Sequence, residues 1–196
     1  MAMALILTFL ILFGVTAPKP HRTSIRGQQV STNRFLWPGS KYQLVDTGSI
    51  VFNDSLPSGN RYYIRFGSRT FNPKQHKITR QIEEAIPTPD TIVAKIDGSD
   101  FYGTDGEMPR TEIDTFVVVI NGRSISIPRS KYRDLFNPNV YYKYGSEPCC
   151  GVRAHEAKNG QHLIVDMWGS DGAGGYFVAF YFDHNKLLRR SVENGF

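Results

Sequence analysis

Residues 163–192 read LIVDMWGSDGAGGYFVAFYFDHNKLLRRSV, and this stretch decides the fold that the sequence predicts. Residues 162–168 and 176–182 are apolar at nearly every position and are rich in Val, Ile, Phe, Tyr and Trp. Such residues are typical of strands that are buried on both faces. Together with residues 187–192 they predict three successive antiparallel strands, which the rest of the chain covers.

The loop at 169–175 contains four glycines in seven residues. A phosphate-binding loop opens a helix whose N–H groups point at the anion, whereas an aromatic strand follows here, so the pattern favours a simple chain reversal. The residues that flank the loop form a candidate binding lip: Asp166, Trp168, Asp171 and Tyr176. A carboxylate among apolar neighbours needs a partner, which Asp166 is expected to find on the last strand. The cations there are Lys186, Arg189 and Arg190.

The net charge of +5 is concentrated at the N-terminal end. Four of the 23 basic residues and none of the 18 acidic residues precede residue 41, which leaves 19 basic against 18 acidic residues and a net charge of +1. A nearly neutral domain lacks the basic surface of a nucleic-acid-binding protein. No nucleic-acid partner is therefore expected.

The N-terminal residues divide into two segments that precede the predicted domain. Residues 1–17 are apolar and end in small residues, which predicts a signal peptide or a short hydrophobic anchor. The apolar run is too short to cross about 30 Å of hydrocarbon as a helix. Residues 18–40 are basic and polar without periodicity, which predicts a linker. A single globular domain is expected over 41–196, in a chain that is secreted, periplasmic or anchored to a membrane outside the cytoplasm.

A hairpin is predicted for residues 49–53 and 61–67, because the residues between them are dense in turn formers. Apolar and basic side chains alternate in its second strand, which gives it one core face and one solvated face. The solvated face carries Arg61, Tyr63 and Arg65 and is a second candidate binding surface, for a glycan or a nucleic acid.

One amphipathic helix is predicted over residues 73–86. Asn72 suits the N-cap position and Pro73 the first turn. Apolar residues recur at i, i+4, i+7 and i+8 and would share one helix face; they are Ile78, Ile82, Ala85 and Ile86. The charges oppose the helix dipole, because lysines come first and glutamates last.

Further strands and turns are predicted in the middle of the chain. Residues 91–97 are expected to form a strand, and the acidic loop that follows does not match a calcium-binding pattern. Asn121-Gly122 lies between two runs of β-forming residues and predicts a type I′ hairpin. Residues 130–136 are expected to form a short helix.

Cys149 and Cys150 are the only cysteines, and they are adjacent. Neighbouring cysteines close a disulfide only with strain and do not have the spacing of a structural zinc site. The domain is therefore not disulfide-stapled, and neither a metal nor another cofactor is expected. A cysteine nucleophile with His155 or His162 and Asp166 would define a small hydrolase, but only the residue types support it.

The sequence thus predicts a β-dominated α+β fold, with an antiparallel twisted sheet or small sandwich covered by the helix at 73–86. The first functional hypothesis is an exported non-enzymatic domain that binds a protein or cell-envelope component, which the N-terminal segment would place close to a membrane. The alternatives are the cysteine-dependent hydrolase and a glycan- or nucleic-acid-binding module. No catalytic residue is assigned.

Overall fold

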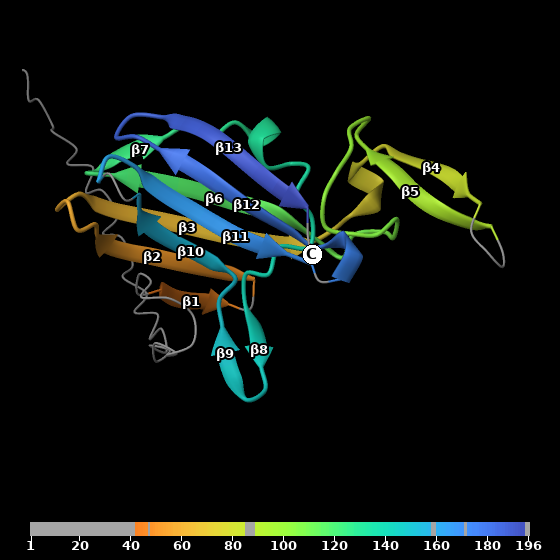
Figure 1. Cartoon of the computed structure of the whole chain (residues 1–196), viewed down its shortest axis with the longest axis horizontal. Coiled ribbons are helices and arrows are strands. Elements are labelled where there is room, and N and C mark those ends of the chain that lie inside the picture. Colours follow the sequence, from red (N-terminus) through yellow and green to blue (C-terminus); the bar gives the residue numbers. More distant parts are fainter. Residues whose placement is uncertain (1–41, 47, 85–88, 158–159, 171, 195–196) are drawn as a thin grey trace, which may run out of the picture.

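The computed structural model describes residues 42–46, 48–84, 89–157, 160–170 and 172–194. Two antiparallel sheets pack face to face as a β-sandwich, from which two smaller hairpins project (Figure 1). The N-terminal segments predicted at 1–17 and 18–40 lie outside the described residues.

The first sheet has five strands in the order β1-β2-β3-β6-β7. These strands are β1 (Tyr42–Asp46), β2 (Ser49–Ser55), β3 (Arg61–Thr70), β6 (Thr111–Ile120) and β7 (Arg123–Ile125). The hairpin predicted around Asn121-Gly122 is confirmed: both residues have positive φ, as a type I′ turn requires, and they connect β6 to β7. The earlier hairpin is confirmed as β2 and β3, with longer strands than predicted.

The second sheet has four strands in the order β10-β11-β12-β13. They are β10 (Val152–Glu156), β11 (Leu163–Gly169), β12 (Tyr176–Phe182) and β13 (Leu187–Asn194). The three strands predicted from residues 163–192 are confirmed as β11, β12 and β13, and β10 adds a fourth. Their burial on both faces is only partly correct, because the outward Trp168, Phe177 and Tyr181 are half-buried.

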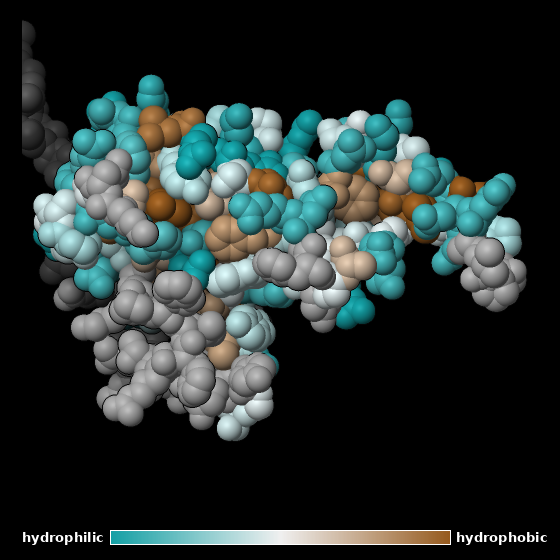
Figure 2. All heavy atoms as spheres, viewed as in Figure 1, coloured by the Kyte–Doolittle hydropathy of each residue, from teal (hydrophilic) through white to brown (hydrophobic). Residues whose placement is uncertain are grey.

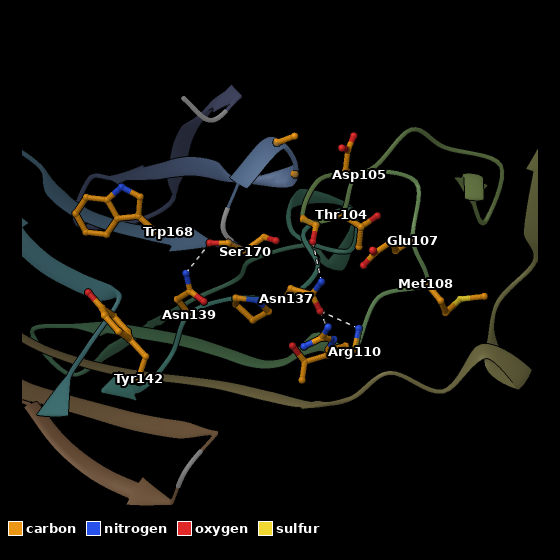
Figure 3. A pocket seen from close by; sticks show the side chains of 15 residues that line it. Thr104, Asp105, Glu107, Met108, Arg110, Asn137, Asn139, Tyr142, Trp168 and Ser170 are labelled. Atoms are coloured by element: carbon orange, nitrogen blue, oxygen red, sulfur yellow. Dashed lines mark hydrogen bonds between the residues drawn. The ribbon is translucent and has the colours of Figure 1, made fainter. Parts of the chain in front are cut away.

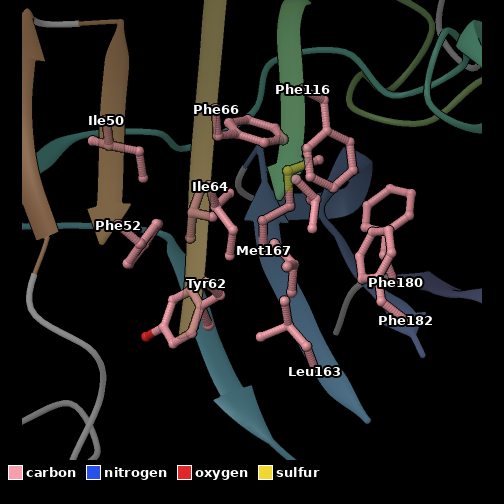
Figure 4. Close-up of a cluster of buried hydrophobic side chains, with 14 of the residues drawn as sticks. Ile50, Phe52, Tyr62, Ile64, Phe66, Phe116, Leu163, Met167, Phe180 and Phe182 are labelled. Carbon is pink, nitrogen blue, oxygen red and sulfur yellow. The ribbon is translucent and has the colours of Figure 1, made fainter. Parts of the chain in front are cut away.

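The main core fills the space between the two sheets (Figure 4). Side chains alternate along each strand, so every second residue points inward. Phe116 of β6 meets Phe180 of β12 with ring centroids 4.9 Å apart in an edge-to-face arrangement. Apolar burial between sheets is the main stabilising contribution in such a fold.

Two hairpins lie outside the sandwich. One consists of β4 (Ile78–Glu83) and β5 (Asp90–Ile96), and we call it the arm. The other consists of β8 (Tyr142–Tyr144) and β9 (Glu147–Cys149). A small second core holds the base of the arm; its buried members are Phe71, Val93, Ile96 and Phe136.

The prediction of an α+β fold with a main helix over 73–86 is wrong. The described residues contain only three 3-10 turns, η1 (Pro73–Gln75), η2 (Arg129–Lys131) and η3 (Gly172–Gly174). Asn72 does act as an N-cap, since its side chain accepts a hydrogen bond from the Lys74 N–H, but the turn ends after three residues.

The segment that follows this turn forms β4 instead of a helix. Its β-branched Ile78, Thr79 and Ile82 favour a strand, and Ile78 pairs with Ile96 of β5. The two sheets cover each other, so the predicted helix has no inner face left to cover. Of the predicted helix face, Ala85 and Ile86 lie outside the described residues. The short helix predicted at 130–136 reduces to η2.

In the part of the chain that the structure describes, no helix is both long and apolar enough to cross a membrane.

Candidate binding cleft

A cleft of about 930 Å³ opens where the sandwich meets the base of the arm (Figure 3). Three chain segments line it: the loop that leads into β6, the segment that leads into β8, and the end of β11 with the turn that follows it. Loops that cluster at one end of a rigid sandwich commonly carry binding residues. The lining lies within residues 103–111, 137–142 and 168–174.

Asn137 ties the three segments together. Its backbone has a positive φ of 49°, a conformation that asparagine tolerates better than most residues. Its side-chain oxygen accepts hydrogen bonds from the N–H groups of Arg110 and Thr111, at 2.8 and 3.0 Å, and its side-chain nitrogen donates to the Gly103 carbonyl at 2.7 Å. Its own carbonyl accepts a 2.7 Å hydrogen bond from the Ser170 N–H. Asn137 therefore links the two sides of the cleft, which are the 103–111 segment and the segment at Ser170.

Asn139 strengthens the same junction from two residues further on. Its backbone N–H donates to the Trp168 carbonyl, and its side chain donates to the Ser170 carbonyl, both at 2.9 Å. The chain passes so close to Gly151 that a Cβ there would lie 2.0 Å from the Asn139 carbonyl oxygen. Only glycine permits this approach. Close backbone packing at Gly151 therefore helps to fix Asn139, and with it the side of the cleft that contains Trp168 and Ser170.

The glycine-rich loop takes part in this packing. A Cβ on Gly174 would lie 2.5 Å from the Thr104 carbonyl carbon, and one on Gly169 would lie 2.1 Å from the Tyr176 ring. The loop forms one 3-10 turn and then enters β12. Gly174 therefore allows the loop to contact the 103–111 segment closely, and Gly169 leaves room for the ring of Tyr176 on the neighbouring strand.

The two walls of the cleft differ in chemistry, as Figure 3 shows. Trp168 and Tyr142 lie on one side and provide aromatic surface. Asp105 and Glu107 lie on the other side, where both are exposed. Sites for small ligands typically combine apolar surface with a few polar groups of fixed position.

Asp166 is buried on the outer face of the second sheet, with 3% of its surface exposed. The prediction that the last strand supplies its partner is wrong. Arg153 Nε lies 2.6 Å from one carboxylate oxygen and His155 Nε2 lies 2.8 Å from the other. Both partners come from β10, because Arg153 lies directly opposite Asp166 in the sheet. The Arg153 guanidinium also stacks on Trp168, 4.2 Å from the ring centroid.

The other predicted binding residues do not gather at one site. Tyr176 points into the core, only 2% exposed, and burial strongly raises the pKa of its hydroxyl. Asp171 lies outside the described residues. Arg61, Tyr63 and Arg65 alternate with core residues of β3, so they lie on the outer face of the first sheet. Of the described residues predicted around the glycine-rich loop, only Asp166 and Trp168 share a face, and the three β3 residues form a separate group on the other sheet.

The two cysteines of the hydrolase hypothesis lie at the end of β9 and just after it, outside the second sheet, whereas His155 lies on β10 and His162 immediately precedes β11. Cys149 is buried and Cys150 packs against the main core, and neither forms a disulfide. The Cys150 thiol donates to the Val152 carbonyl at 3.1 Å. Burial raises the pKa of this thiol to about 12, although the backbone contact with Val152 opposes the shift. His155 instead contacts Asp166 on the outer face, an arrangement that does not activate Cys150.

Within the described part of the chain, no group of three or more His, Cys, Asp or Glu side chains is placed to hold a metal ion. Asn137 and Asn139, which shape the cleft, were missed by the sequence analysis, which ended a short helix at residue 136 and assigned no functional role to either asparagine. The enrichment of asparagine at positive φ is the one signal that could have marked Asn137. Nothing local in the sequence indicates its partners, which lie about thirty residues away on either side.

Comparison of the chain with protein-family models, with curated proteins and with solved structures finds no match.

Proposed function

We propose that this chain is an exported, non-enzymatic domain that binds a cell-envelope component, and that the cleft is its binding site. The apolar segment at 1–17 and the basic segment at 18–40 support export and a position close to a membrane. The observation that carries the proposal is that hydrogen bonds within the protein join the two sides of the cleft. Asn137 and Asn139 hold its walls by hydrogen bonds that need no ligand, and a preformed site loses little entropy on binding.

The ligand chemistry that best fits the cleft is a saccharide. The aromatic side of the cleft, with Trp168 and Tyr142, suits the apolar C–H faces of a sugar ring. The exposed carboxylates of Asp105 and Glu107 can accept hydrogen bonds from its hydroxyl or amino groups. A polysaccharide of the cell envelope offers both kinds of surface in every unit.

Co-sedimentation of the purified full chain with insoluble envelope polysaccharide from its source organism tests this proposal. We expect Trp168→Ala to weaken binding about fivefold or more, because it removes an aromatic contact of roughly 1 kcal/mol or more. Glu107→Gln should also weaken binding, and as an exposed substitution it leaves the core intact. Tyr63→Ala is the matched control, because Tyr63 lies on the outer face of the other sheet.

Two results would contradict the proposal. One is full retention of binding by both cleft variants. The other is loss of binding in Tyr63→Ala with an affinity that falls steeply with salt, which would favour a charged ligand at the Arg61, Tyr63 and Arg65 surface.

A further inference from the structure

The outer half of the arm is almost completely exposed. Its base is held by the small core and by His76, whose Nδ1 lies 2.8 Å from Asp97 Oδ2. Beyond the base, every β4 residue from Thr79 to Glu83 is exposed, and Ile82 is 73% exposed. Hydrophobic residues are visible on the surface of the arm in Figure 2. A two-stranded ribbon of this kind is marginally stable by itself.

The two edges of the arm differ. The free edge of β5 is partly covered, because the Val93 N–H donates a 2.7 Å hydrogen bond to the Gly106 carbonyl of the neighbouring loop. Among the described residues, β4 pairs only with β5. Its outer edge therefore presents unpaired backbone groups, which readily accept another strand.

The side chains of β4 and of Glu84, the residue that follows it, are complementary to a second copy of the same segment. When two identical strands pair antiparallel in one sheet, they are related by a two-fold axis perpendicular to that sheet. A residue on the axis then lies opposite its own copy, and the residue two positions before it lies opposite the partner's residue two positions after it. If Ile82 lies on the axis, it packs against the partner's Ile82. Arg80 then lies opposite the partner's Glu84, and this ion pair occurs twice. Within the described residues, Arg80 and Glu84 are exposed and no ion pair involves either.

We propose that β4 of this chain pairs antiparallel with β4 of a second copy. The two arms then form one continuous four-stranded sheet, in which each exposed Ile82 is covered. The contact is smaller than a standard protein interface, so the dimer is weak and depends on protein concentration. This inference is independent of the ligand that the cleft binds.

Cysteine crosslinking of the full chain tests the register. In Ile82→Cys the two introduced side chains are directly opposite, with Cβ atoms about 4.5–5.5 Å apart, close to disulfide geometry. In Gln81→Cys, an equally exposed control on the same strand, they are displaced by two residues and about 7–8 Å apart. We expect mild oxidation to give a disulfide-linked dimer with Ile82→Cys and little or none with Gln81→Cys. Equal crosslinking of the two variants would overturn the proposed register.

Charge exchange tests the pairing itself. Arg80→Glu and Glu84→Arg each replace two attractive pairs by two repulsive ones, so each should weaken the dimer about tenfold or more in sedimentation equilibrium. The double variant Arg80→Glu/Glu84→Arg restores opposite charges across the axis and should recover the wild-type dissociation constant. Circular dichroism confirms that these exposed variants fold. A chain that stays monomeric at every concentration, or a dimer that does not respond to the single exchanges, would overturn the proposal.

Discussion

Asn137 shows how one side chain can set the shape of a cleft. It makes three side-chain hydrogen bonds to backbone groups of the 103–111 segment, in a left-handed conformation that alanine adopts poorly. We expect Asn137→Ala to lower the free energy of unfolding by about 3 kcal/mol, because it leaves backbone groups unsatisfied and adds about 1 kcal/mol of strain. Asn137→Gly, which relieves only the strain, should lose about 1 kcal/mol less. Denaturant unfolding measures both, and a wild-type midpoint for Asn137→Ala would refute this role.

Cys150 provides the prediction on pH. Burial raises the pKa of its thiol to about 12, so the thiol stays protonated at neutral pH. Because the thiolate is the reactive form, alkylation of Cys150 in a Cys149→Ser variant should be slow at pH 8. The rate should continue to rise above pH 9, where an ordinary thiol is already ionised. The same protein in denaturant is the control, and rapid alkylation of the folded variant at pH 8 would contradict the prediction.

At the scale of elements, the arm depends on a charged cluster at its base. Glu112 of β6 is 3% exposed and contacts Arg69, Arg129 and His76, at 2.9, 3.3 and 3.3 Å. His76 also contacts Asp97, the residue after β5. Burial tends to raise the pKa of Asp97, but hydrogen bonds from the Lys77 N–H and from His76 lower it overall. Asp97 is therefore ionised at neutral pH, and its carboxylate can hold His76 and the Lys77 N–H at the base of the arm.

Glu112→Gln should loosen the arm selectively, since it removes the charge that His76 and the two arginines share. We expect faster hydrogen exchange in β4 and β5 at constant pH, with unchanged exchange in β11 and β12. Asp114→Asn, an exposed carboxylate beside the same Arg69, is the control. Equal acceleration of hydrogen exchange in the arm and in β11 and β12 would show that the cluster stabilises the whole fold and not the arm alone.

The elements also show which features the sequence could predict. Local patterns predicted two of these features. Apolar runs predicted the strands of residues 163–192, and a turn that needs positive φ predicted the Asn121-Gly122 hairpin. The prediction of a helix at 73–86 was wrong because the spacing of the apolar residues alone cannot distinguish a helix face from a strand. Ile82, which was expected to pack on the predicted helix face, is exposed. The cleft could not be predicted, because Asn137 joins segments that only the folded topology brings together.

At the scale of the whole molecule, the described residues from Tyr42 onward form both sheets and the core between them. Residues 41–196 carry a net charge close to zero, and neither Cys149 nor Cys150 forms a disulfide. We therefore expect a fragment of residues 41–196 to fold cooperatively and remain soluble. Circular dichroism and size-exclusion chromatography measure this. Aggregation of the fragment, with the full chain behaving well, would mean that the N-terminal segments contribute to the fold.

The most direct test of the proposed function is a crystal structure of the protein with an oligosaccharide from the cell envelope of its source organism. The account predicts the sugar in the cleft, with one ring against Trp168 and polar contacts to Asp105 or Glu107. A sugar bound instead on the outer face of the first sheet, at Arg61, Tyr63 and Arg65, would contradict it.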